Sequence, residues 1–234
     1  PPSGHMTSPG TLSLQNATFE AILTDVAQSL KMHGFRNIIF IGDSGGNQTP
    51  QHTVAERLTA EWGGEPVVAH IQAYYDYAGV SRYMAYRGLE VGAVDGLHDD
   101  PNFTLNMFYA DPSSIRYEER VTAGFTTING VSLTDRVQTL EHARAMVGFR
   151  ARETASAITK AIANRGTLPT PAAPARARSG SSPRPAPDPR SMGGGDCLAN
   201  AYNCVDAPNP LPPADTVWLE EMTWMDVRDA MTAG

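Results

Sequence analysis

The turn at residues 42–47 (Gly-Asp-Ser-Gly-Gly-Asn) gathers residue types that can do chemistry. It follows an apolar run and precedes a helical pattern, which is where open α/β sheets bind ligands, outside the carboxyl end of a strand. Glycines let the backbone approach a ligand, and the N-terminus of the next helix stabilises an anion or an oxyanion. We therefore predict Asp43 as a metal ligand or base. The predicted substrate-binding residues of this turn are Ser44, Gly45, Gly46 and Asn47.

The residue order in this turn excludes three common motifs. It lacks the G-x-S-x-G spacing of the nucleophile elbow, and it is neither a dinucleotide fingerprint nor a Walker loop. The alternative to a site is a tight turn in which Asn47 caps the following helix.

A second stretch, residues 96–101 (Gly-Leu-His-Asp-Asp-Pro), brings one imidazole and two carboxylates together. These groups bind Zn²⁺ or Mn²⁺ and move protons near neutral pH. We predict His98 and Asp99 as catalytic residues and Asp100 as a metal ligand. The alternatives are a solvated loop for His98 and, for Asp100, the cap of a helix that starts at Pro101.

Two further side chains are predicted to bind substrate. His5 lies in a Pro/Gly-rich stretch, where on its own it would be a surface residue. Tyr75 belongs to an aromatic group at 74–77 that follows a predicted strand and either lines a pocket or serves packing. His70 lies within that strand and is predicted to be a satisfied structural residue.

Hydrophobic periodicity positions these stretches in an α/β fold. Helix, strand, helix, strand is the order typical of a parallel sheet covered by helices on both faces, a three-layer αβα arrangement. Residues 102–110 are ambiguous between helix and strand. We predict helices near 19–30 (ended by Gly34), 50–62, 79–88 and 137–164 (ended by Gly166), and strands at 37–42 and 66–71.

The C-terminal part has a different composition. Residues 166–215 hold 11 of the 18 prolines, together with Ser, Gly, Ala and Arg. Such a segment cannot bury enough apolar surface to offset its chain entropy, so we predict a disordered linker. The predicted organisation is an α/β domain at 1–165, this linker at 166–215, and a short amphipathic segment at 216–234.

The net charge and the distribution of apolar residues limit the classes of partner that this chain could bind. The net charge of −7 argues against nucleic acid, and the chain has no apolar run long enough for a membrane span. We expect a small-molecule substrate. No leader peptide is visible, and Cys197 and Cys204 either pair or stay as free thiols, so the location stays open between cytoplasm and, with a leader outside this chain, periplasm.

Several segments, taken in order, resemble the creatininase family of amidohydrolases. In that family a His precedes F-P-G-T-x-S-L, an apolar strand runs into N-G-H-G-G-N, and H-A-G-x-x-E-T-S leads to an apolar helix and a Pro. The matching stretches here, which lie within residues 4–165, are 4–6 (Gly-His-Met), 9–14 (Pro-Gly-Thr-Leu-Ser-Leu), 38–47, and 98–112, which keeps the His-to-Pro length.

The same comparison shows departures. The family's metal-binding His of N-G-H-G-G-N falls on Ser44 and the Glu of E-T-S falls on Phe103, whereas His98 matches the family's His. Residues 219–230 resemble the start of family members, and the family's E-x-H-G-type motif is not found in this sequence. We therefore expect a divergent member, truncated or permuted, whose 1–165 domain lacks the first strands of its sheet.

The resemblance implies metal-dependent hydrolysis of a non-peptide C–N bond, such as that of a cyclic amide, with Zn²⁺ or Mn²⁺, and a compact homo-oligomer. His98 would donate or accept the proton, Asp99 or Asp100 would orient it or hold metal, and the Gly45–Gly46 backbone would stabilise developing negative charge. The alternative is a catalytically impaired family-fold protein that binds a small ligand or a partner subunit. A weaker alternative is a phosphate or nucleotide binder.

Overall fold

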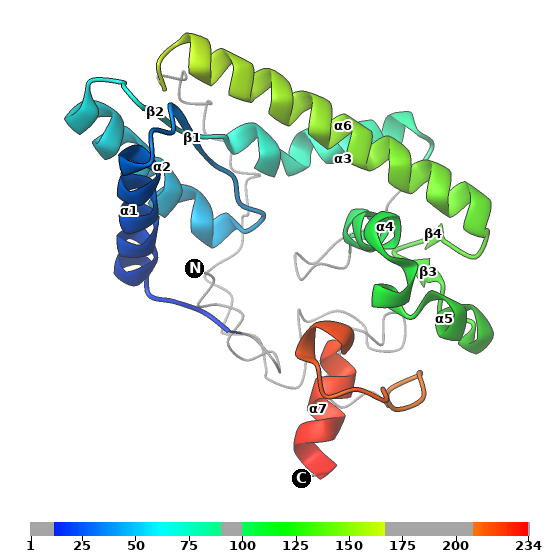
Figure 1. The fold of residues 1–234 in the computed structure, drawn as a ribbon. Coiled ribbons are helices and arrows are strands. Elements are labelled where there is room, and N and C mark those ends of the chain that lie inside the picture. The colour runs from blue at the N-terminus through cyan, green and yellow to red at the C-terminus, as the bar shows by residue number, and fades with distance from the viewer. Residues whose placement is uncertain (1–11, 90–99, 167–207, 234) are drawn as a thin grey trace, which may run out of the picture. The chain divides into compact units, whose positions relative to one another are not determined.

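The computed structural model describes residues 12–89, 100–166 and 208–233 of the chain (Figure 1). These residues form two compact units. Unit 1 contains Leu12–Tyr77 and the described part of Arg150–Gly180, and unit 2 contains Ala78–Phe149 and the described part of Ser181–Gly234. Most of the predicted linker, with both cysteines, lies outside the described residues. None of the described helices has the length and apolar character needed to cross a membrane.

Unit 1 has the predicted helix–strand–helix–strand order. It runs through α1 (Asn16–Met32), β1 (Asn37–Phe40), α2 (Gly45–Trp62) and β2 (Val67–His70). The two strands are parallel, with Asn37 opposite Val67 and Phe40 opposite His70. Mixed helix with a small parallel sheet agrees with the α/β class predicted from the sequence.

Each face of the β1–β2 pair packs against helices. Ile38, Phe40 and Val68 form one buried cluster with residues of α1 and α2, among them Ala27 and Leu58. Val67, Ala69 and Ile71 form another with Ala161, from the second half of α6 (Arg136–Ala163). All four residues of β2 are buried, which explains why the strand is an apolar run and not an alternating pattern.

Helix α2 begins earlier than predicted. The predicted start near residue 50 is wrong, because the helix begins at Gly45 and carries Pro50 inside it. Ser44 occupies the N-cap position, and the backbone N–H of Asn47 donates to the Ser44 carbonyl at 3.0 Å. Asn47 therefore lies in the first turn and is not the cap.

Glycines in the left-handed region follow three helices that have residues in unit 1: Gly34 after α1, Gly63 after α2 and Gly166 after α6. Gly34 follows α1 at φ 81° and Gly166 follows α6 at φ 83°. Their surroundings differ: a Cβ on Gly34 would meet nothing within 4 Å, whereas a Cβ on Gly166 would lie 2.7 Å from the carbonyl oxygen of Val68 in β2. The same left-handed backbone conformation is therefore required at both positions, but only Gly166 also lacks room for a Cβ atom.

This pair provides a matched stability test. Gly34→Ala should lower the free energy of unfolding by about 1 kcal/mol, because only the left-handed backbone is penalised. Gly166→Ala should cost about 1–3 kcal/mol more, because the added methyl group overlaps a backbone atom that cannot rotate away. Urea denaturation of both variants measures the difference. Equal losses would show that the β2 carbonyl moves without cost.

Unit 2 is mostly helical. Its elements are α3 (Tyr77–Tyr86, whose first residue belongs to unit 1), α4 (Pro101–Ala110), the 3-10 turn η3 (Pro112–Ile115), α5 (Tyr117–Ala123), the hairpin β3 (Thr127–Ile128) and β4 (Val131–Ser132), and the first half of α6. The ambiguous residues 102–110 are helical. Asp100 caps α4 by accepting a 2.8 Å hydrogen bond from the N–H of Asn102, and Pro101 takes the first helical position.

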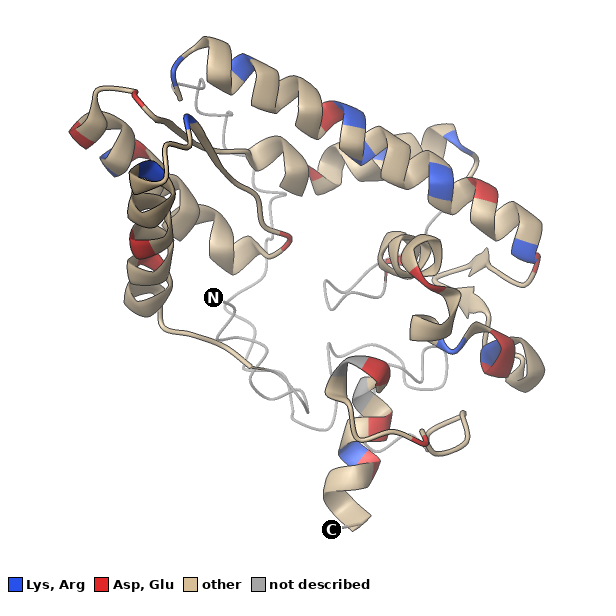
Figure 2. Cartoon of the chain, viewed as in Figure 1, with Lys and Arg blue, Asp and Glu red and all other residues tan. Residues whose placement is uncertain are grey.

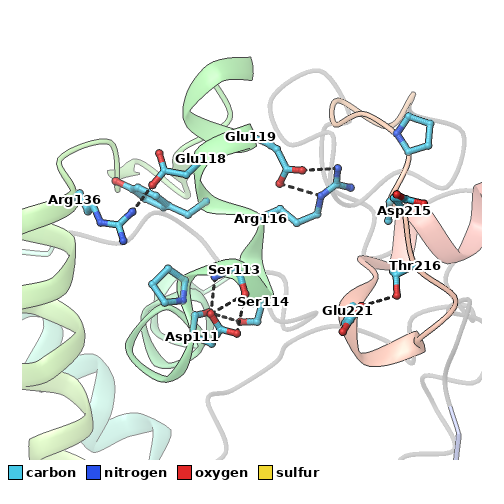
Figure 3. Close-up of a pocket in the computed structure, with 14 residues that line it drawn as sticks. Asp111, Ser113, Ser114, Arg116, Glu118, Glu119, Arg136, Asp215, Thr216 and Glu221 are labelled. Carbon is cyan, nitrogen blue, oxygen red and sulfur yellow. Dashed lines mark hydrogen bonds and ion pairs between the residues drawn. The ribbon is translucent and has the colours of Figure 1, made fainter.

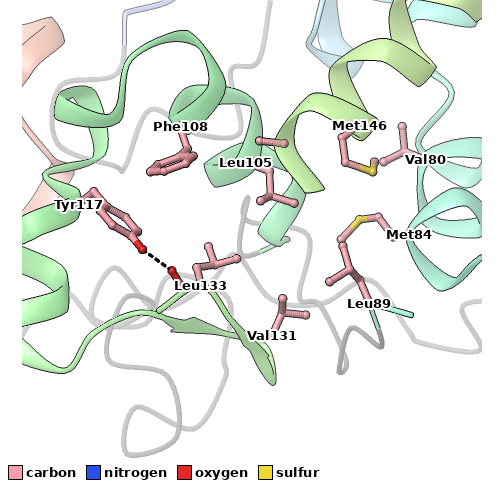
Figure 4. Close-up of a cluster of buried hydrophobic side chains, with 10 residues drawn as sticks. Val80, Met84, Leu89, Leu105, Phe108, Tyr117, Val131, Leu133 and Met146 are labelled. Atoms are coloured by element: carbon pink, nitrogen blue, oxygen red, sulfur yellow. Dashed lines mark hydrogen bonds between the residues drawn. The ribbon is translucent and has the colours of Figure 1, made fainter. Parts of the chain in front are cut away.

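One apolar cluster forms the core of unit 2 (Figure 4). Leu105, Phe108 and Met146 are at most 1% exposed, and the Phe108 and Tyr117 ring centroids lie 4.8 Å apart. The Tyr117 hydroxyl donates to the Leu133 carbonyl at 2.9 Å, so the phenol is buried without losing its hydrogen bond.

The C-terminal segment packs within unit 2. It contains η5 (Leu219–Glu221) and α7 (Trp224–Ala233). Thr223 and Asp226 form a reciprocal cap at the start of α7: the backbone N–H of each residue donates to the side chain of the other, as in a capping box. The Arg116 Nη1 donates to Asp226 Oδ1 at 3.0 Å, across 110 residues of sequence, and its Nη2 donates to the Pro212 carbonyl at 2.6 Å.

Candidate functional site

The candidate site of unit 1 lies where β1 and β2 end. The turn at 42–47 follows β1, and residues 71–77, including the 3-10 turn η2 (Gln72–Tyr75), follow β2. Because the strands are parallel, their carboxyl ends lie at the same edge, and the two segments meet there. Tyr77 donates its hydroxyl to Asp43 Oδ1 at 2.8 Å. This is the placement that the sequence predicts for the turn.

Asp43 is also held by Arg150 from helix α6. Arg150 Nη2 lies 2.8 Å from Asp43 Oδ1, and Nη1 lies 3.3 Å from Oδ2. Both carboxylate oxygens therefore accept a hydrogen bond from one guanidinium, the bidentate geometry that Arg favours. The Asp43 side chain is 37% exposed, so one side of the pair faces solvent.

Arg150 is anchored on several sides. Acidic and basic residues are interspersed along α6 (Figure 2), yet of these Arg150 alone is buried. Its Nη2 also donates to the Tyr74 carbonyl at 2.8 Å, and its guanidinium carbon lies 4.4 Å from the Tyr74 ring centroid and 5.6 Å from that of Tyr77. Burial lowers the pKa of Arg150, but the hydrogen bond and charge of Asp43 outweigh it and raise the pKa above its ordinary value.

The acidity of Tyr77 follows from the same contacts. Burial raises the pKa of the Tyr77 phenol well above its ordinary value, and the hydrogen bond to Asp43 and the Asp43 charge raise it further. Tyr77 is therefore a protonated donor at any physiological pH. Its ring contacts Tyr75 edge-on, with centroids 4.8 Å apart.

Gln48 and His70 fix the backbone of the turn. The Gln48 side-chain amide donates to the carbonyls of Gly42 and Ser44, each at 2.8 Å. Its oxygen must then be the atom that faces His70 Nε2 at 2.9 Å, so His70 is the donor and carries its proton on Nε2. Burial, with a smaller effect of His52, lowers the pKa of His70 to about 4. His70 is thus a neutral structural residue, as predicted.

Two glycines of the turn are closely packed. A Cβ on Gly42 would overlap the side-chain amide of Gln51, and a Cβ on Gly45 would lie 3.0 Å from the Tyr75 hydroxyl. Gln51 is buried, and its amide oxygen has no hydrogen-bond partner in the described structure. Glycine at 45 leaves the backbone at the start of α2 open beside the hydroxyl of Tyr75.

The predicted site residues divide into three groups. Unit 1 brings together Asp43, Tyr75 and the turn residues 44–47. Asp100 belongs to unit 2, where its carboxylate caps α4. His5, His98 and Asp99 lie outside the described residues, so the convergence of His98 with Asp43 stays a prediction.

Sequence reasoning missed the residues that hold Asp43 and the turn. Arg150 lies in a helix whose other charges are solvated, and nothing in its local sequence distinguishes it. Tyr77 belongs to the aromatic group at 74–77 that the sequence singles out, but only Tyr75 of that group was predicted as a site residue. Nothing in the sequence around Gln48 indicates its role, except that it directly follows the turn at 42–47.

Both predicted metal ligands, Asp43 and Asp100, make other contacts in the described structure, and Asp100 accepts the N–H of Asn102. Asp43 has both oxygens engaged by Arg150 and Tyr77, and position 44 supplies a hydroxyl, a poorer ligand for Zn²⁺ than imidazole. No group of three or more His, Cys, Asp or Glu residues in the described part of the chain could hold a metal ion.

Unit 2 holds a separate open pocket of about 1040 Å³, formed by residues 111–114 and 116–119, Arg136 and the C-terminal segment (Figure 3). Arg116 is paired with Glu119, and Arg136 with Glu118. Asp111 instead binds the backbone and hydroxyl of Ser113. The pocket is acidic, and none of its lining residues was predicted as a site residue. Its acidic lining residues are Asp111, Glu118, Glu119, Asp215 and Glu221.

The strand–helix–strand unit with a glycine turn at the strand ends defines an α/β protein with a candidate ligand site at the sheet edge. A family model described as Creatininase: Creatinine amidohydrolase matches residues 2–172. The chain belongs to the creatininase family, and this family suggests an amidohydrolase of the creatinine amidohydrolase type. Neither a curated protein nor a solved structure gives a significant match.

Proposed function

We propose that this chain hydrolyses a non-peptide C–N bond in a small molecule, such as the ring amide of a cyclic compound. The observation that carries the proposal is the family match over residues 2–172. The geometry supports it: a glycine turn opens the start of an 18-residue helix at the ends of two parallel strands, and such a helix end stabilises negative charge on a carbonyl oxygen.

Several described residues would have specific roles in this reaction. The backbone at Gly45 and Gly46 would face the oxygen that becomes negative, and the Tyr75 hydroxyl next to Gly45 would orient the substrate. Gln48 would keep the turn in place through its bonds to two turn carbonyls. His98 stays the proposed proton donor or acceptor, with Asp99 to orient it and His5 to bind substrate.

The metal part of the proposal is separate. Zn²⁺ or Mn²⁺ would polarise the amide and activate water, whereas the described carboxylate of Asp43 is paired with Arg150. Chelation decides the matter: activity that EDTA abolishes and Zn²⁺ or Mn²⁺ restores would establish a metal requirement. Activity indifferent to the chelator would remove it.

The function is tested with the purified chain on a panel of small linear and cyclic amides, with the new carboxylate or amine product measured by mass spectrometry. Gly45→Val should lower the rate at least about tenfold, the equivalent of ~1.4 kcal/mol in the barrier, because the side chain would meet the Tyr75 hydroxyl. Ala60→Val adds the same branching at an exposed position of the same helix and should leave the rate unchanged. No turnover on any amide would contradict the proposal.

The engagement of Asp43 by Arg150 favours a second candidate, a family-fold protein that binds a small ligand or a partner subunit without catalysis. In that case the chain would bind an amide in calorimetry and return it intact. Saturable binding with no product after prolonged incubation would select this candidate. Product formation would exclude it.

We also propose the larger organisation predicted from the sequence. The 1–165 region would form the three-layer αβα domain and 216–234 a short amphipathic segment. The 166–215 region would be a disordered linker up to residue 207, since residues 208–215 pack within unit 2, where the Pro212 carbonyl accepts from Arg116. A homo-oligomer is the proposed assembly. Light scattering of the purified chain tests it, and a monomer at micromolar concentration would contradict it.

A further inference from the structure

We propose that Arg150 is the resident cation of the candidate site, and that Asp43 therefore binds this guanidinium and not a divalent metal. The inference concerns the same site as the proposed function. It holds whether or not that site hydrolyses an amide. It assigns Arg150 as a positioning residue, because the guanidinium fixes where the carboxylate lies beside the turn.

The contacts of Asp43 leave little room for a metal. Arg150 reaches both of its oxygens, at 2.8 and 3.3 Å, and the Tyr77 hydroxyl adds a third hydrogen bond at 2.8 Å. A metal ion bonded to either oxygen at about 2.0–2.2 Å would come within a few ångströms of the guanidinium. The two cations would repel each other in a partly desolvated place, where charges are weakly screened.

Arg150 cannot easily leave to make room. Its side chain is 9% exposed, and moving it would break the hydrogen bond to the Tyr74 carbonyl and the contacts with the Tyr74 and Tyr77 rings. The Arg150 backbone lies in the middle of a 28-residue helix, so the guanidinium could leave Asp43 only by a change of the Arg150 side-chain rotamer. Pairing of Asp43 with the Arg150 guanidinium is thus favoured over binding of a metal ion from solution.

The neighbouring position agrees with this assignment. Ser44 offers a neutral hydroxyl and occupies the N-cap of α2. A carboxylate already paired with arginine, next to a serine, is a poor donor set for Zn²⁺, which prefers imidazole, thiolate and free carboxylate. Any metal that the chain binds would therefore be held without Asp43.

The first arm of the test measures metal directly. The full chain and its Asp43→Asn variant are equilibrated with ZnCl₂ or MnCl₂, dialysed, and analysed for metal per chain. Asp25→Asn, at an exposed position of α1, is the control. We expect the same metal content in all three, whether that content is one equivalent or none. A loss of one equivalent in Asp43→Asn alone would overturn the proposal. Because no activity is measured, failure of the amidohydrolase assay leaves this result unaffected.

The second arm asks whether the position takes a guanidinium. Arg150→Ala should lose thermal stability and regain about 3 °C in melting temperature with millimolar methylguanidinium, relative to equal NaCl, because a ligand that binds only the folded state stabilises it. The double variant Arg150→Ala/Asp43→Asn should show no such rescue. A folded Arg150→Ala that is not rescued, or a double variant rescued equally, would overturn the assignment. If Arg150→Ala does not fold, the metal measurement decides.

Discussion

Replacing Arg116 with alanine is expected to lower the free energy of unfolding by about 3–5 kcal/mol, because it leaves a buried carboxylate without its cation. The side chains of Arg116 and Asp226 are 8% and 2% exposed. Arg116 also supplies the hydrogen bond to the Pro212 carbonyl. The C-terminal segment 208–233 should detach first, and limited proteolysis would show early cleavage there, while urea denaturation gives the total loss.

The matched control is Glu118→Gln, in the exposed pair that Glu118 forms with Arg136 in the same unit. Exposed ion pairs contribute little, so this change should cost less than about 0.5 kcal/mol. In the double variant Arg116→Met/Asp226→Asn both charges are removed together, and the loss should be smaller than the sum of the single losses. Asp226 also accepts hydrogen bonds from Asn209 Nδ2 and from the Thr223 N–H, each at 2.8 Å. An Arg116→Ala variant as stable as Glu118→Gln would show that hydrogen bonds from Asn209 and Thr223 alone satisfy the Asp226 carboxylate.

The stability of the chain should fall steeply as pH drops from about 6.5 to 4, through His70. In the unfolded chain His70 titrates at its ordinary pKa of 6.5, whereas in the fold its pKa is about 4. Between these two pH values the unfolded state binds more protons at His70 than the folded state does, so lowering the pH favours unfolding. The contribution of His70 is complete above pH 6.5, decreases by about 1.4 kcal/mol per pH unit, and is lost below pH 4, for a total of about 3 kcal/mol.

His70→Gln isolates this effect, because glutamine keeps a donor toward Gln48 but does not titrate. Urea denaturation of both proteins across pH 4–8 gives two curves. Other titrating groups, including His142, whose pKa burial also lowers, act in both proteins and cancel in the difference. The free energy of unfolding of the wild type should fall relative to that of the variant only between about pH 6.5 and pH 4. Parallel curves would mean that His70 becomes charged in the folded state without cost.

The sequence was most informative where a local pattern decides the structure. The apolar runs that became β1 and β2, and the glycines that end α1 and α6, gave the correct elements. The hairpin β3–β4 was missed although its signal was present: Asn129-Gly130 is a typical pair for a two-residue hairpin turn, and both residues have positive φ. The flanking strands contain only two residues each, too few for an alternation pattern to be recognised.

The candidate site was predictable only in part, for a physical reason. The turn at 42–47 follows from a strand that runs into glycines, which is local information. The partner of Asp43 lies 107 residues away, and a buried arginine is indistinguishable in sequence from the solvated arginines beside it on α6. Long-range ion pairs depend on how helix α6 packs against the sheet, and no local pattern encodes that packing.

Helix α6 supplies Met146 to the core of unit 2 and Ala161 to a core of unit 1. Its hydrogen-bonded backbone runs without a break through the boundary between Phe149 and Arg150. Fraying of α6 from its N-terminus therefore removes packing contacts from unit 2, and fraying from its C-terminus removes them from unit 1. In either case the helix that the other unit also packs against becomes shorter. Calorimetry should accordingly record one merged heat-absorption peak for the two units, and not two resolved ones.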